Sequence, residues 1–449
     1  MGTLTSVTHR DARDAANAGA KDATSVRQRI SRQRPLVGAY VSLLLFMVVY
    51  CARPEDWIPG LSVVPLAKIT AILALLGLVF YVRYIRQRWP QEVIYLVFLI
   101  GQLFLASMMS PVWRGGALQK TLDFAKVLLL VIVITMAVNT AGRLRRLIFV
   151  QAASVAVIAM VAVLKGHLIV GRLAGTLGGN YSDPNDLALA IIISLPLCFA
   201  LLLLNRSGIW KAAWALVMLV MLYAVFLTAS RGGLVTLIAT AAIFLWEFAI
   251  RGRRRYLLVL AVLVSFVLWQ FSSGTLAERF KGALNGTESS AEGRQQLFWR
   301  SVEVTKRHPL FGVGPGNFGE LSGSWHATHN SFTEMSSEGG VLAFVLYVLI
   351  LWSGFKNLRA SKRIARGRTE LSLLARALHA SLVGYLVGSL FLSVAYQFFP
   401  YFLVAYTTVL FQIAKKSASH SKERESVSQE GSETWTPLQG AIDTAGLAP

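Results

Sequence analysis

The chain has 449 residues, of which 55% are hydrophobic and only 15% charged, a composition that excludes an ordinary soluble domain and predicts an integral membrane protein. The 44 lysines and arginines against 23 aspartates and glutamates give a formal net charge of +21. We attribute this charge to membrane topology and to attraction between the protein and anionic membrane lipids, and not to nucleic-acid binding.

Apolar runs long enough to cross a bilayer recur along the chain. We expect about twelve transmembrane helices, at residues 36–52, 64–82, 92–109, 121–139, 147–164, 186–204, 212–229, 233–250, 256–272, 339–355, 371–394 and 399–414. These runs divide the chain into an N-terminal basic tail (1–35), a bundle of about nine helices (36–272), one large polar loop (273–338), three further helices (339–414) and a C-terminal tail (415–449). We expect both tails to be disordered.

The positions of lysine and arginine predict which side of the membrane each loop occupies. With both termini in the cytoplasm, most of the 44 basic residues fall in cytoplasmic segments. The opposite orientation would put the basic runs at 251–255 and 362–363 on the translocated side, against the preference of lysine and arginine for cytoplasmic loops. The sequence therefore predicts that the 273–338 loop lies on the outer side.

Cationic residues occur near the outer ends of several predicted spans. Lys68 and Lys126 each lie about one turn inside such an end. Lys126 can pair with Asp123 on the same helix face, or both lysines can bind a lipid-linked diphosphate. A polar loop then precedes the span at 186–204, where Asp183-Pro184 is a signal for a helix start.

Two asparagines flank that signal. Asn180 and Asn185 either belong to the turn or donate hydrogen bonds to sugar or phosphate.

Further along, the midpoint of the run 212–250 falls on Ser230-Arg231-Gly232-Gly233, where we expect the glycines to permit a tight reversal. Arg231 is either a hairpin anchor at the interface or a fork directed at an anion such as phosphate.

The large loop contains one helical pattern and one glycine-rich turn. The pattern opens near Gly293-Arg294, includes Trp299 and ends before Pro309. Gly312, Gly314 and Gly316 invite comparison with a dinucleotide-binding loop, but no strand precedes them and no helix begins after the last glycine. We expect them to form a turn that lets the backbone pack closely.

Two histidines lie near the C-terminal end of the large polar loop. His326 and His329 are followed by Glu334 and Glu338, but this spacing matches no strong metal pattern, so we predict no metal site. Asn330, with Ser331, is typical of a helix start and is also a candidate substrate ligand. His329 is either structural or a general base, because a histidine near neutral pH suits the activation of a sugar hydroxyl.

Taken in order, these motifs resemble the O-antigen ligase and polymerase superfamily. The resemblance covers roughly residues 175–345 and rests on the four segments Ser230–Gly233, Gly293-Arg294 with Trp299, Pro309–Phe318, and His329-Asn330-Ser331 followed by Glu338-Gly339-Gly340. It implies an all-α protein of the bacterial inner membrane with about twelve transmembrane helices, an arrangement like that of C-type glycosyltransferases, and one large periplasmic loop.

Members of this superfamily take a glycan from an undecaprenyl diphosphate carrier on the periplasmic side. Ligases pass it to lipid A–core, polymerases to another lipid-linked repeat, and some relatives to protein hydroxyls. By resemblance, His329 matches the essential loop histidine, and Arg231 and Arg294 match the arginines assigned to the diphosphate. The resemblance also implies an inverting, metal-independent reaction without a cofactor. We expect a ligase that uses lipid A–core, with the other two acceptors as alternatives.

A different class of function is also compatible with many spans and outer cations, namely a transporter of lipid-linked sugars. Transporters usually carry charged or broken helices at the membrane midplane, in paired positions of two repeats. The sequence has no visible repeat, and most of its polar residues gather at the outer face. We therefore favour the enzyme, whose candidate substrate ligands are completed by Asn180, Asn185, Lys68, Lys126, Trp299 and Asn330.

Overall fold

The computed structural model describes residues 37–79, 89–169, 171–175, 181–252, 254–271, 289–323, 326–365 and 369–433. Asn180, the predicted N-terminal tail and the first part of the predicted large loop lie outside these residues. Nearly all described elements are helices, which confirms the all-α prediction. The only sheet among the described residues is a small antiparallel ribbon, in which β1 (Leu168–Ile169) pairs with β2 (Arg172–Leu173).

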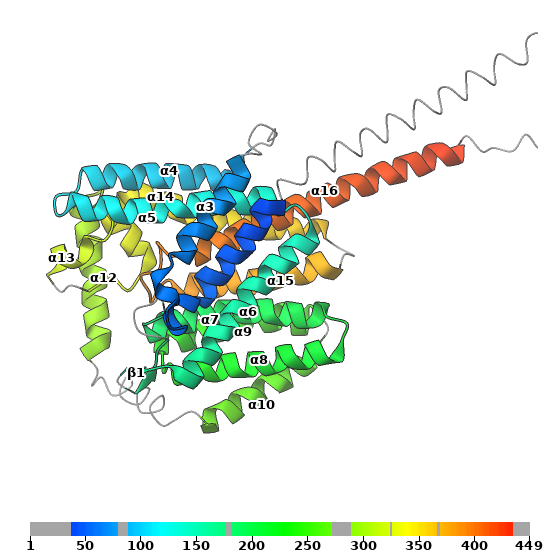
Figure 1. Cartoon of the computed structure of the whole chain (residues 1–449), viewed down its shortest axis with the longest axis horizontal. Coiled ribbons are helices and arrows are strands. Elements are labelled where there is room, and N and C mark those ends of the chain that lie inside the picture. The colour runs from blue at the N-terminus through cyan, green and yellow to red at the C-terminus, as the bar shows by residue number, and fades with distance from the viewer. Residues whose placement is uncertain are drawn as a thin grey trace, which may run out of the picture.

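The described helices follow one another with short connections (Figure 1). In chain order they are a helix at Val37–Ala52, α2 (Pro54–Trp57), the 3-10 turn η1 (Leu61–Val63), α3 (Leu66–Val79), α4 (Gln91–Met108), α5 (Arg114–Ala137), α6 (Ala141–Lys165), α7 (Pro184–Leu204), α8 (Gly208–Leu227), α9 (Arg231–Leu245), the π-helical turn η3 (Trp246–Ile250), α10 (Tyr256–Phe271), α12 (Ser289–Arg307), α13 (Phe318–Ser322), α14 (Ser331–Ile364), α15 (Thr369–Gly388) and α16 (Phe399–Glu433).

Seven of these described helices are long and apolar enough to cross a membrane, namely α4, α6, α7, α8, α9 with η3, α14 and α15. The helix at Val37–Ala52 and the segment Leu66–Gly77 are apolar but shorter. Each of the predicted spans coincides with a helix, although the total of about twelve crossings stays a prediction. The chain is thus an integral membrane protein by the length and composition of its helices.

Helix α7 lies at the centre of the bundle. Its sequence is apolar on all sides, and 83% of its membrane-spanning window is buried, as expected for a helix without a polar face. It packs against α6, α8, α9 and α15, while α14 packs against α4 and α16 on the other side of α15. Helices α12 and α13 lie together at one end of the bundle, and α16 extends from the opposite end (Figure 1).

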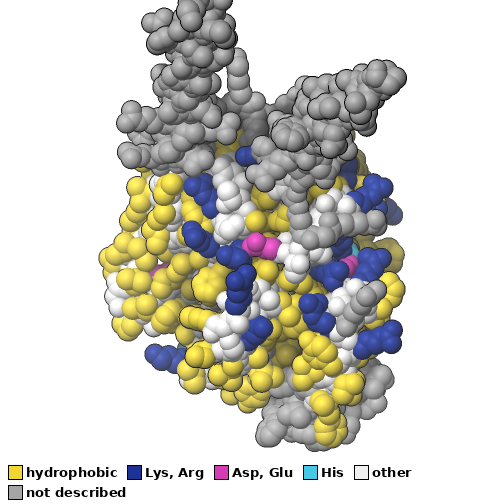
Figure 2. Space-filling view, turned by 90° about the vertical axis from the view of Figure 1, so that its right-hand side faces the viewer, with side chains coloured by type: hydrophobic (Ala, Val, Ile, Leu, Met, Phe, Trp, Pro, Cys, Tyr) yellow, Lys and Arg dark blue, Asp and Glu magenta, His cyan; other side chains and the backbone are white. Residues whose placement is uncertain are grey.

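The end from which α16 extends is basic. Figure 2 shows this end face-on, with many lysine and arginine side chains spread over it and few acidic ones between them. The helix ends that meet there carry basic residues in the sequence, among them Arg143, Arg145, Arg206, Arg251 and Lys362. This is the side that the distribution of lysine and arginine predicts to be cytoplasmic.

A buried carboxylate fastens three helices together at this basic end. Glu247 in η3 is only 2% exposed, and its Oε1 accepts a hydrogen bond from Lys362 of α14. The Nδ1 atom of His379, on α15, lies 2.9 Å from the same oxygen. Arg376 donates to the backbone carbonyl of Glu247 at 3.2 Å. The π-helical turn therefore places one acidic side chain between the end of α14 and the middle of α15.

Helix α14 begins earlier than the predicted span and is broken. It starts at Ser331, and Gly340 has φ 83° and ψ 175°, which interrupts the helix. The backbone groups freed by the break find other partners, since Val341 N–H donates to Pro309 O at 2.8 Å and Gln102 Nε2 donates to Gly339 O at 2.9 Å. The end of the predicted loop is therefore helical.

Two predicted boundaries differ at the C-terminal end of the chain. The span expected at 371–394 ends at Gly388, because residues 389–394 bond to the start of α14 and do not continue the helix. We call residues 389–398 the α15–α16 connection. Helix α16 continues to Glu433, so the first part of the predicted tail is helical. Extending an existing helix through lysine, glutamate and glutamine requires no new nucleation.

The tight reversal between α8 and α9 is made by other residues than expected. The chain turns at Thr228–Ser230, where Ala229 has φ 45°, and the two glycines lie in the first turn of α9. A Cβ at Gly232 would lie 3.0 Å from Phe391, and one at Gly233 would lie 3.0 Å from Ala188. The glycines thus permit close packing, and the prediction that they form the reversal is wrong.

Candidate functional site

The start of α14 positions His329. Asn330 caps the helix, because its side-chain oxygen accepts from the N–H groups of Phe332 at 2.9 Å and Thr333 at 3.1 Å. This agrees with the predicted helix start. His329 itself has φ 52°, a left-handed conformation that is uncommon for residues other than glycine. Its backbone N–H donates to Ser393 Oγ at 2.9 Å, which holds this conformation in place.

The α15–α16 connection forms the support for this segment. Ser331 N–H donates to Ser389 O at 2.8 Å, and Ser331 Oγ donates to Leu392 O at 2.7 Å. Val394 N–H donates to Ser331 Oγ at 3.0 Å. The sequence analysis missed this connection, because residues 371–394 form a continuous apolar run. The small polar residues Ser389 and Ser393 within that run are the signal that could have revealed it.

Several charged groups act on His329. The half-buried site lowers the pKa of its imidazole first by desolvation and then by the positive charge of Arg294 on α12, with a further lowering from His326. Asp183, which caps α7, opposes these effects and raises the pKa of His329. The net pKa lies below the ordinary histidine value, so the ring is neutral near pH 7 and can accept a proton. The structure therefore brings His329 and Arg294 together.

A second arginine site surrounds the α8–α9 turn. Arg172 of β2 donates to Thr228 O at 3.0 Å and to Asn185 Oδ1 at 2.8 Å. The same oxygen of Asn185 accepts from Ser230 Oγ at 2.6 Å, and that hydroxyl accepts from Gly233 N–H at 3.0 Å. Asn185 thus connects the start of α7 to the start of α9. The sequence analysis did not single out Arg172.

Arg231 is the first residue of α9, directly after this turn. The following residue, Gly232, packs against Phe391, which belongs to the same α15–α16 connection that holds His329. Gly232, next to Arg231, and the backbone of His329 therefore contact the same connection. Together with Arg294 and Arg172, they place three arginines and one neutral histidine around the ends of α7, α9, α12 and α14. This arrangement suits an anionic ligand beside a proton acceptor.

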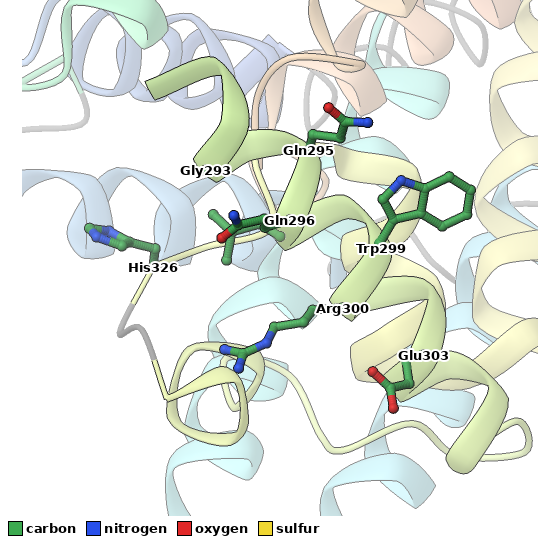
Figure 3. Close-up of a pocket in the computed structure, with 8 residues that line it drawn as sticks. Gly293, Gln295, Gln296, Trp299, Arg300, Glu303 and His326 are labelled. Atoms are coloured by element: carbon green, nitrogen blue, oxygen red, sulfur yellow. The ribbon is translucent and has the colours of Figure 1, made fainter. Parts of the chain in front are cut away.

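A wide cavity of about 820 Å³ lies along α12 (Figure 3). Trp299 is 61% exposed and projects with Gln295 from one side of the helix, while Gln296 and Arg300 lie on the side facing the segment that carries His326 (Figure 3). The lining is completed by Gly293, Leu297 and Glu303. Amide and carboxylate groups can hydrogen-bond hydroxyls, and an exposed indole offers a face for stacking. The cavity therefore suits a hydroxyl-rich ligand.

The glycine-rich turn fastens the large loop to α14. Gly312 has φ +63°, and a Cβ there would lie 2.5 Å from Ser337 O. Val313 N–H donates to that oxygen at 2.9 Å, and Gly314 N–H donates to Glu338 O at 2.9 Å. The Glu338 carboxylate in turn accepts from Gly316 N–H at 2.7 Å. The expected close packing of the glycine-rich turn is therefore observed.

Two acidic residues that follow His329 are buried beside a lysine. Glu334 and Glu338 are 5% and 4% exposed, and the charges of both act on Lys120 of α5. Glu334 Oε2 accepts from Ala395 N–H at 3.2 Å in the α15–α16 connection. Both carboxylates therefore hold loops in place. Within the described part of the chain, no three His, Cys, Asp or Glu residues cluster as metal ligands would.

The two predicted lysine ligands form a group of their own. Lys126 is about half exposed and pairs with Asp123 one turn earlier on α5, as one of the two predicted alternatives requires. Lys68, on α3, is exposed, and its charge acts on the same aspartate. Among the predicted residues, the structure thus brings His329, Asn330 and the charge of Arg294 together, while Asn185 and Arg231 lie at the starts of α7 and α9.

Fold and site together define a multi-pass helical membrane protein that carries a histidine and several arginines at one end of its bundle. Residues 216–348 match the O-antigen ligase family, a range that includes Arg231, Arg294, Trp299 and His329. This match supports the predicted resemblance to the O-antigen ligase and polymerase superfamily.

One similar protein is the exopolysaccharide production protein ExoQ of Rhizobium meliloti (strain 1021). The two chains are 25% identical over 228 residues, which cover 45% of this chain and 52% of ExoQ. This chain thus spans about half the length of that relative. A solved chain from a study of polymerization and crosslinking by a peptidoglycan synthase complex shares 19% identity, with a TM-score of 0.40 over 72% of this chain and 96% of that chain.

Proposed function

We propose that this protein is a glycosyltransferase of the bacterial inner membrane that moves a glycan from an undecaprenyl diphosphate carrier to an acceptor hydroxyl on the periplasmic face. The observation that carries the proposal is His329, whose pKa is lowered in part by the charge of Arg294, with Arg231 next to the glycine that packs on the connection holding His329. A proton acceptor next to permanent cations is what the transfer of a sugar from a diphosphate requires.

The proposed orientation follows from the two ends of the bundle. The end that carries α12 and the histidine faces the periplasm, and the basic end shown in Figure 2 faces the cytoplasm with both termini. Basic loops are retained on the cytoplasmic side, which supports this assignment. The glycan of the donor then meets the acceptor at the periplasmic ends of α7, α9 and α14. The lipid of the carrier stays in the membrane.

The reaction is a displacement at the anomeric carbon. The acceptor oxygen forms a bond to that carbon while the bond to the carrier diphosphate breaks on the opposite face, so the configuration inverts. His329 orients the hydroxyl and takes its proton, and the electron pair of the broken bond leaves with the diphosphate. The donor is already activated, so neither a cofactor nor a metal is needed.

The arginines stabilise the leaving group. Charge grows on the diphosphate as its bond to the sugar breaks, and Arg231 and Arg294 neutralise that charge from fixed positions. Arginine presents a planar fork that binds two phosphate oxygens at once, which a lysine cannot do. The Arg172 side chain hydrogen-bonds to Thr228 in the α8–α9 turn and to Asn185. It therefore stabilises the turn that precedes Arg231.

For the acceptor, we propose lipid A–core, because the matched family is described as O-antigen ligase. A second candidate is the growing end of a lipid-linked exopolysaccharide, favoured by the similarity to an exopolysaccharide production protein. Purified protein supplied with a lipid-linked repeat and one acceptor at a time separates the two. Glycan found on lipid A–core identifies a ligase, and a ladder of lengthened lipid-linked chains identifies a polymerase.

The central test replaces His329 by alanine. Transfer should fall by roughly 10²–10⁴-fold, the usual contribution of a general base, while the protein still inserts and binds the donor. His326→Ala is the comparison, because it removes a nearby loop histidine whose charge lowers the pKa of His329, and we expect its effect on transfer to be mild. A loss below about tenfold in His329→Ala would make the histidine structural. Activity abolished by EDTA and restored by zinc would refute the metal-free reaction.

Transport of lipid-linked sugars is separated from transfer in sealed vesicles. The proposed enzyme forms a new glycosidic product from a donor supplied on the periplasmic-side leaflet. Movement of the intact lipid-linked sugar between leaflets, without any glycosidic product, would contradict the proposed transferase. The broken helix α14 does not favour transport, because its break at Gly340 bonds to Pro309, just before the glycine-rich turn, and lies close to the loop end of the helix.

A further inference from the structure

An apolar groove lies between α7, α8, α9 and α10. Its volume is about 380 Å³, and Thr240 alone is polar among the described residues that line it. The hydroxyl of Thr240 donates to Thr236 O at 2.7 Å, so it offers the groove no free donor. Leu219 and Leu260 at its rim are 45% and 49% exposed, so the groove opens sideways to the surrounding membrane. An occupant must therefore be apolar along its length.

Three of the four lining helices place the groove toward the basic end of the bundle. On α7 the lining ends at Leu202, two residues before the helix ends. On α9 it runs from Leu237 to Leu245, the last residue of that helix. On α10 it begins at Leu257, the second residue. The eight residues from 237 to 245 rise by about 12 Å, so the groove extends at least that far along the bundle from its basic end.

Cations surround the groove at this end. The backbone N–H of Leu257 donates to Arg254 O at 3.0 Å, so the arginine lies one turn from the groove lining. Arg255 follows it and is exposed, and Arg206 and Lys211 are exposed between α7 and α8. Within the described part of the chain, no carboxylate forms a salt bridge with any of these four cations. Their charges are therefore available to an anionic ligand.

Three exposed aromatic side chains lie beside these cations in the sequence. Trp210 near the start of α8, Trp246 in η3 and Tyr256 at the start of α10 are 58%, 47% and 62% exposed. Arg251 lies 5.6 Å from the ring centroid of Trp246 and 4.0 Å from the carboxylate of Glu247, so this arginine already has partners. Tryptophan and tyrosine favour the level of the lipid head groups, because their rings are apolar and carry one polar atom. The mouth of the groove thus has the side chains of a membrane interface.

Helix α10 lies at the edge of the bundle beside α8 (Figure 1). It packs mainly against α8 and η3, and the groove separates it from α7 and from most of α9. Acyl chains are as apolar as leucine side chains, so a chain in this groove replaces the missing side-chain contacts between the helices. Such a chain would contact all four helices at once.

We propose that this groove binds an acyl chain of an anionic phospholipid whose phosphate lies against Arg254 and Arg255. The groove accepts the chain, and the cations at its mouth favour a lipid with net negative charge over a zwitterionic one. A membrane helix of a partner protein would bring no such charge to the mouth. The lipid would hold α10 to the bundle at the end opposite to His329. The proposal does not depend on the proposed glycan transfer.

The test uses the full-length protein in phosphatidylcholine nanodiscs that hold one copy each, which excludes a second copy as the occupant. The probe is phosphatidylglycerol with a diazirine on one acyl chain. Phosphatidylcholine with the same diazirine chain is the comparison, at the same low mole fraction. The phosphatidylglycerol probe should label peptides from α7, α8, α9 or α10 at least about fivefold more than the phosphatidylcholine probe, because its net charge contacts the cations at the mouth.

Removing two of these cations tests the head-group contact. Arg254→Gln combined with Arg255→Gln should reduce labelling by the phosphatidylglycerol probe by about tenfold or more. The matched control combines Arg359→Gln with Arg363→Gln, which removes two exposed arginines of α14 at the same basic end. This control should label like the unmodified protein. The substituted side chains are at the surface, so both double variants keep the packed interior.

Filling the groove tests the position of the chain. Ala241→Phe adds a ring inside the groove and should reduce labelling by a similar factor. Its control is Ile238→Phe, which lies on the same helix at a position that is 61% exposed and outside the groove. The control should label like the unmodified protein. Both variants should elute as single species.

Four outcomes would overturn the proposal. Equal labelling by the two probes would mean that the groove holds ordinary membrane lipid without selection for charge. Unchanged labelling after the loss of Arg254 and Arg255, or label confined to other helices, would remove the head-group contact or the groove. Stronger competition by a polyprenyl phosphate than by unlabelled phosphatidylglycerol would assign the groove to another lipid. Glycan transfer is not measured in this experiment, so its result bears on the phospholipid site alone.

Discussion

Replacing Asn330 by alanine tests whether this residue supports His329 or binds substrate. The Asn330 side chain accepts two backbone N–H groups at the start of α14 and donates to Leu390 O at 3.2 Å. The Asn330→Ala variant loses all three contacts. The Asn330→Ser variant keeps a capping hydroxyl and loses only the contact with the α15–α16 connection.

The magnitude follows from these contacts. Loss of the cap costs about 1 kcal/mol, and loss of the exposed hydrogen bond to Leu390 costs about 0.5 kcal/mol. We therefore expect Asn330→Ala to lower the free energy of unfolding by about 1.5 kcal/mol and Asn330→Ser to lower it by about 0.5 kcal/mol. Transfer should fall in the alanine variant, because the first turn of the helix no longer fixes His329, and should be largely retained in the serine variant.

The assay combines unfolding of the purified protein in mixed micelles with glycan transfer measured at saturating donor. A structural cap requires stability and transfer to fall together in the order alanine, then serine. Equal loss of transfer in both variants, with the serine variant almost as stable as the unmodified protein, would refute the reasoning. That result would show that the amide itself contacts substrate, as the sequence analysis left open.

Three further predictions concern the arginines and the glycine-rich turn. Arg231→Lys should reduce transfer by roughly tenfold to a hundredfold although the charge is kept; near-normal transfer by Arg231→Ala at normal protein levels would reduce it to a hairpin anchor. Arg294→Gln should raise the pKa of His329, so the acid limb of the pH–rate profile moves to higher pH, whereas Asp183→Asn should move it to lower pH; shifts in the same direction would contradict this. Gly312→Ala should destabilise the protein by more than about 1 kcal/mol, because the left-handed backbone and the contact with α14 leave no room for a Cβ; an unchanged unfolding midpoint would disprove it.

Local features of the site could be predicted from the sequence. The caps at Asp183 and Asn330 depend only on neighbouring backbone N–H groups, so residue type and position were sufficient. The Asp123–Lys126 pair is likewise a contact within one helix. The close packing at Gly312 could be anticipated because glycine is the residue that tolerates a left-handed backbone.

Contacts between distant segments could not be predicted in this way. Ser393 holds His329 from 64 residues away, within a run whose hydrophobicity is typical of a continuous span. Arg172 meets Asn185 and Thr228 only because α7 and α9 pack side by side. The helix break at Gly340 depends on hydrogen bonds from Gln102 and Val341, which no local pattern reports. Hydrophobic periodicity indicates which faces are buried, but not which helices share them.

We expect the bundle to bend about the buried Glu247. Its contacts with Lys362 and His379 join the ends of α9 and α14 to the middle of α15, so we expect this junction to act as a pivot. Helices that are joined at one end separate most at the other. A small tilt about Glu247 therefore moves Arg231 relative to His329 far more than it disturbs the fastened ends. We therefore expect a substitution at Glu247 to change the separation of these two residues at the other end of the bundle.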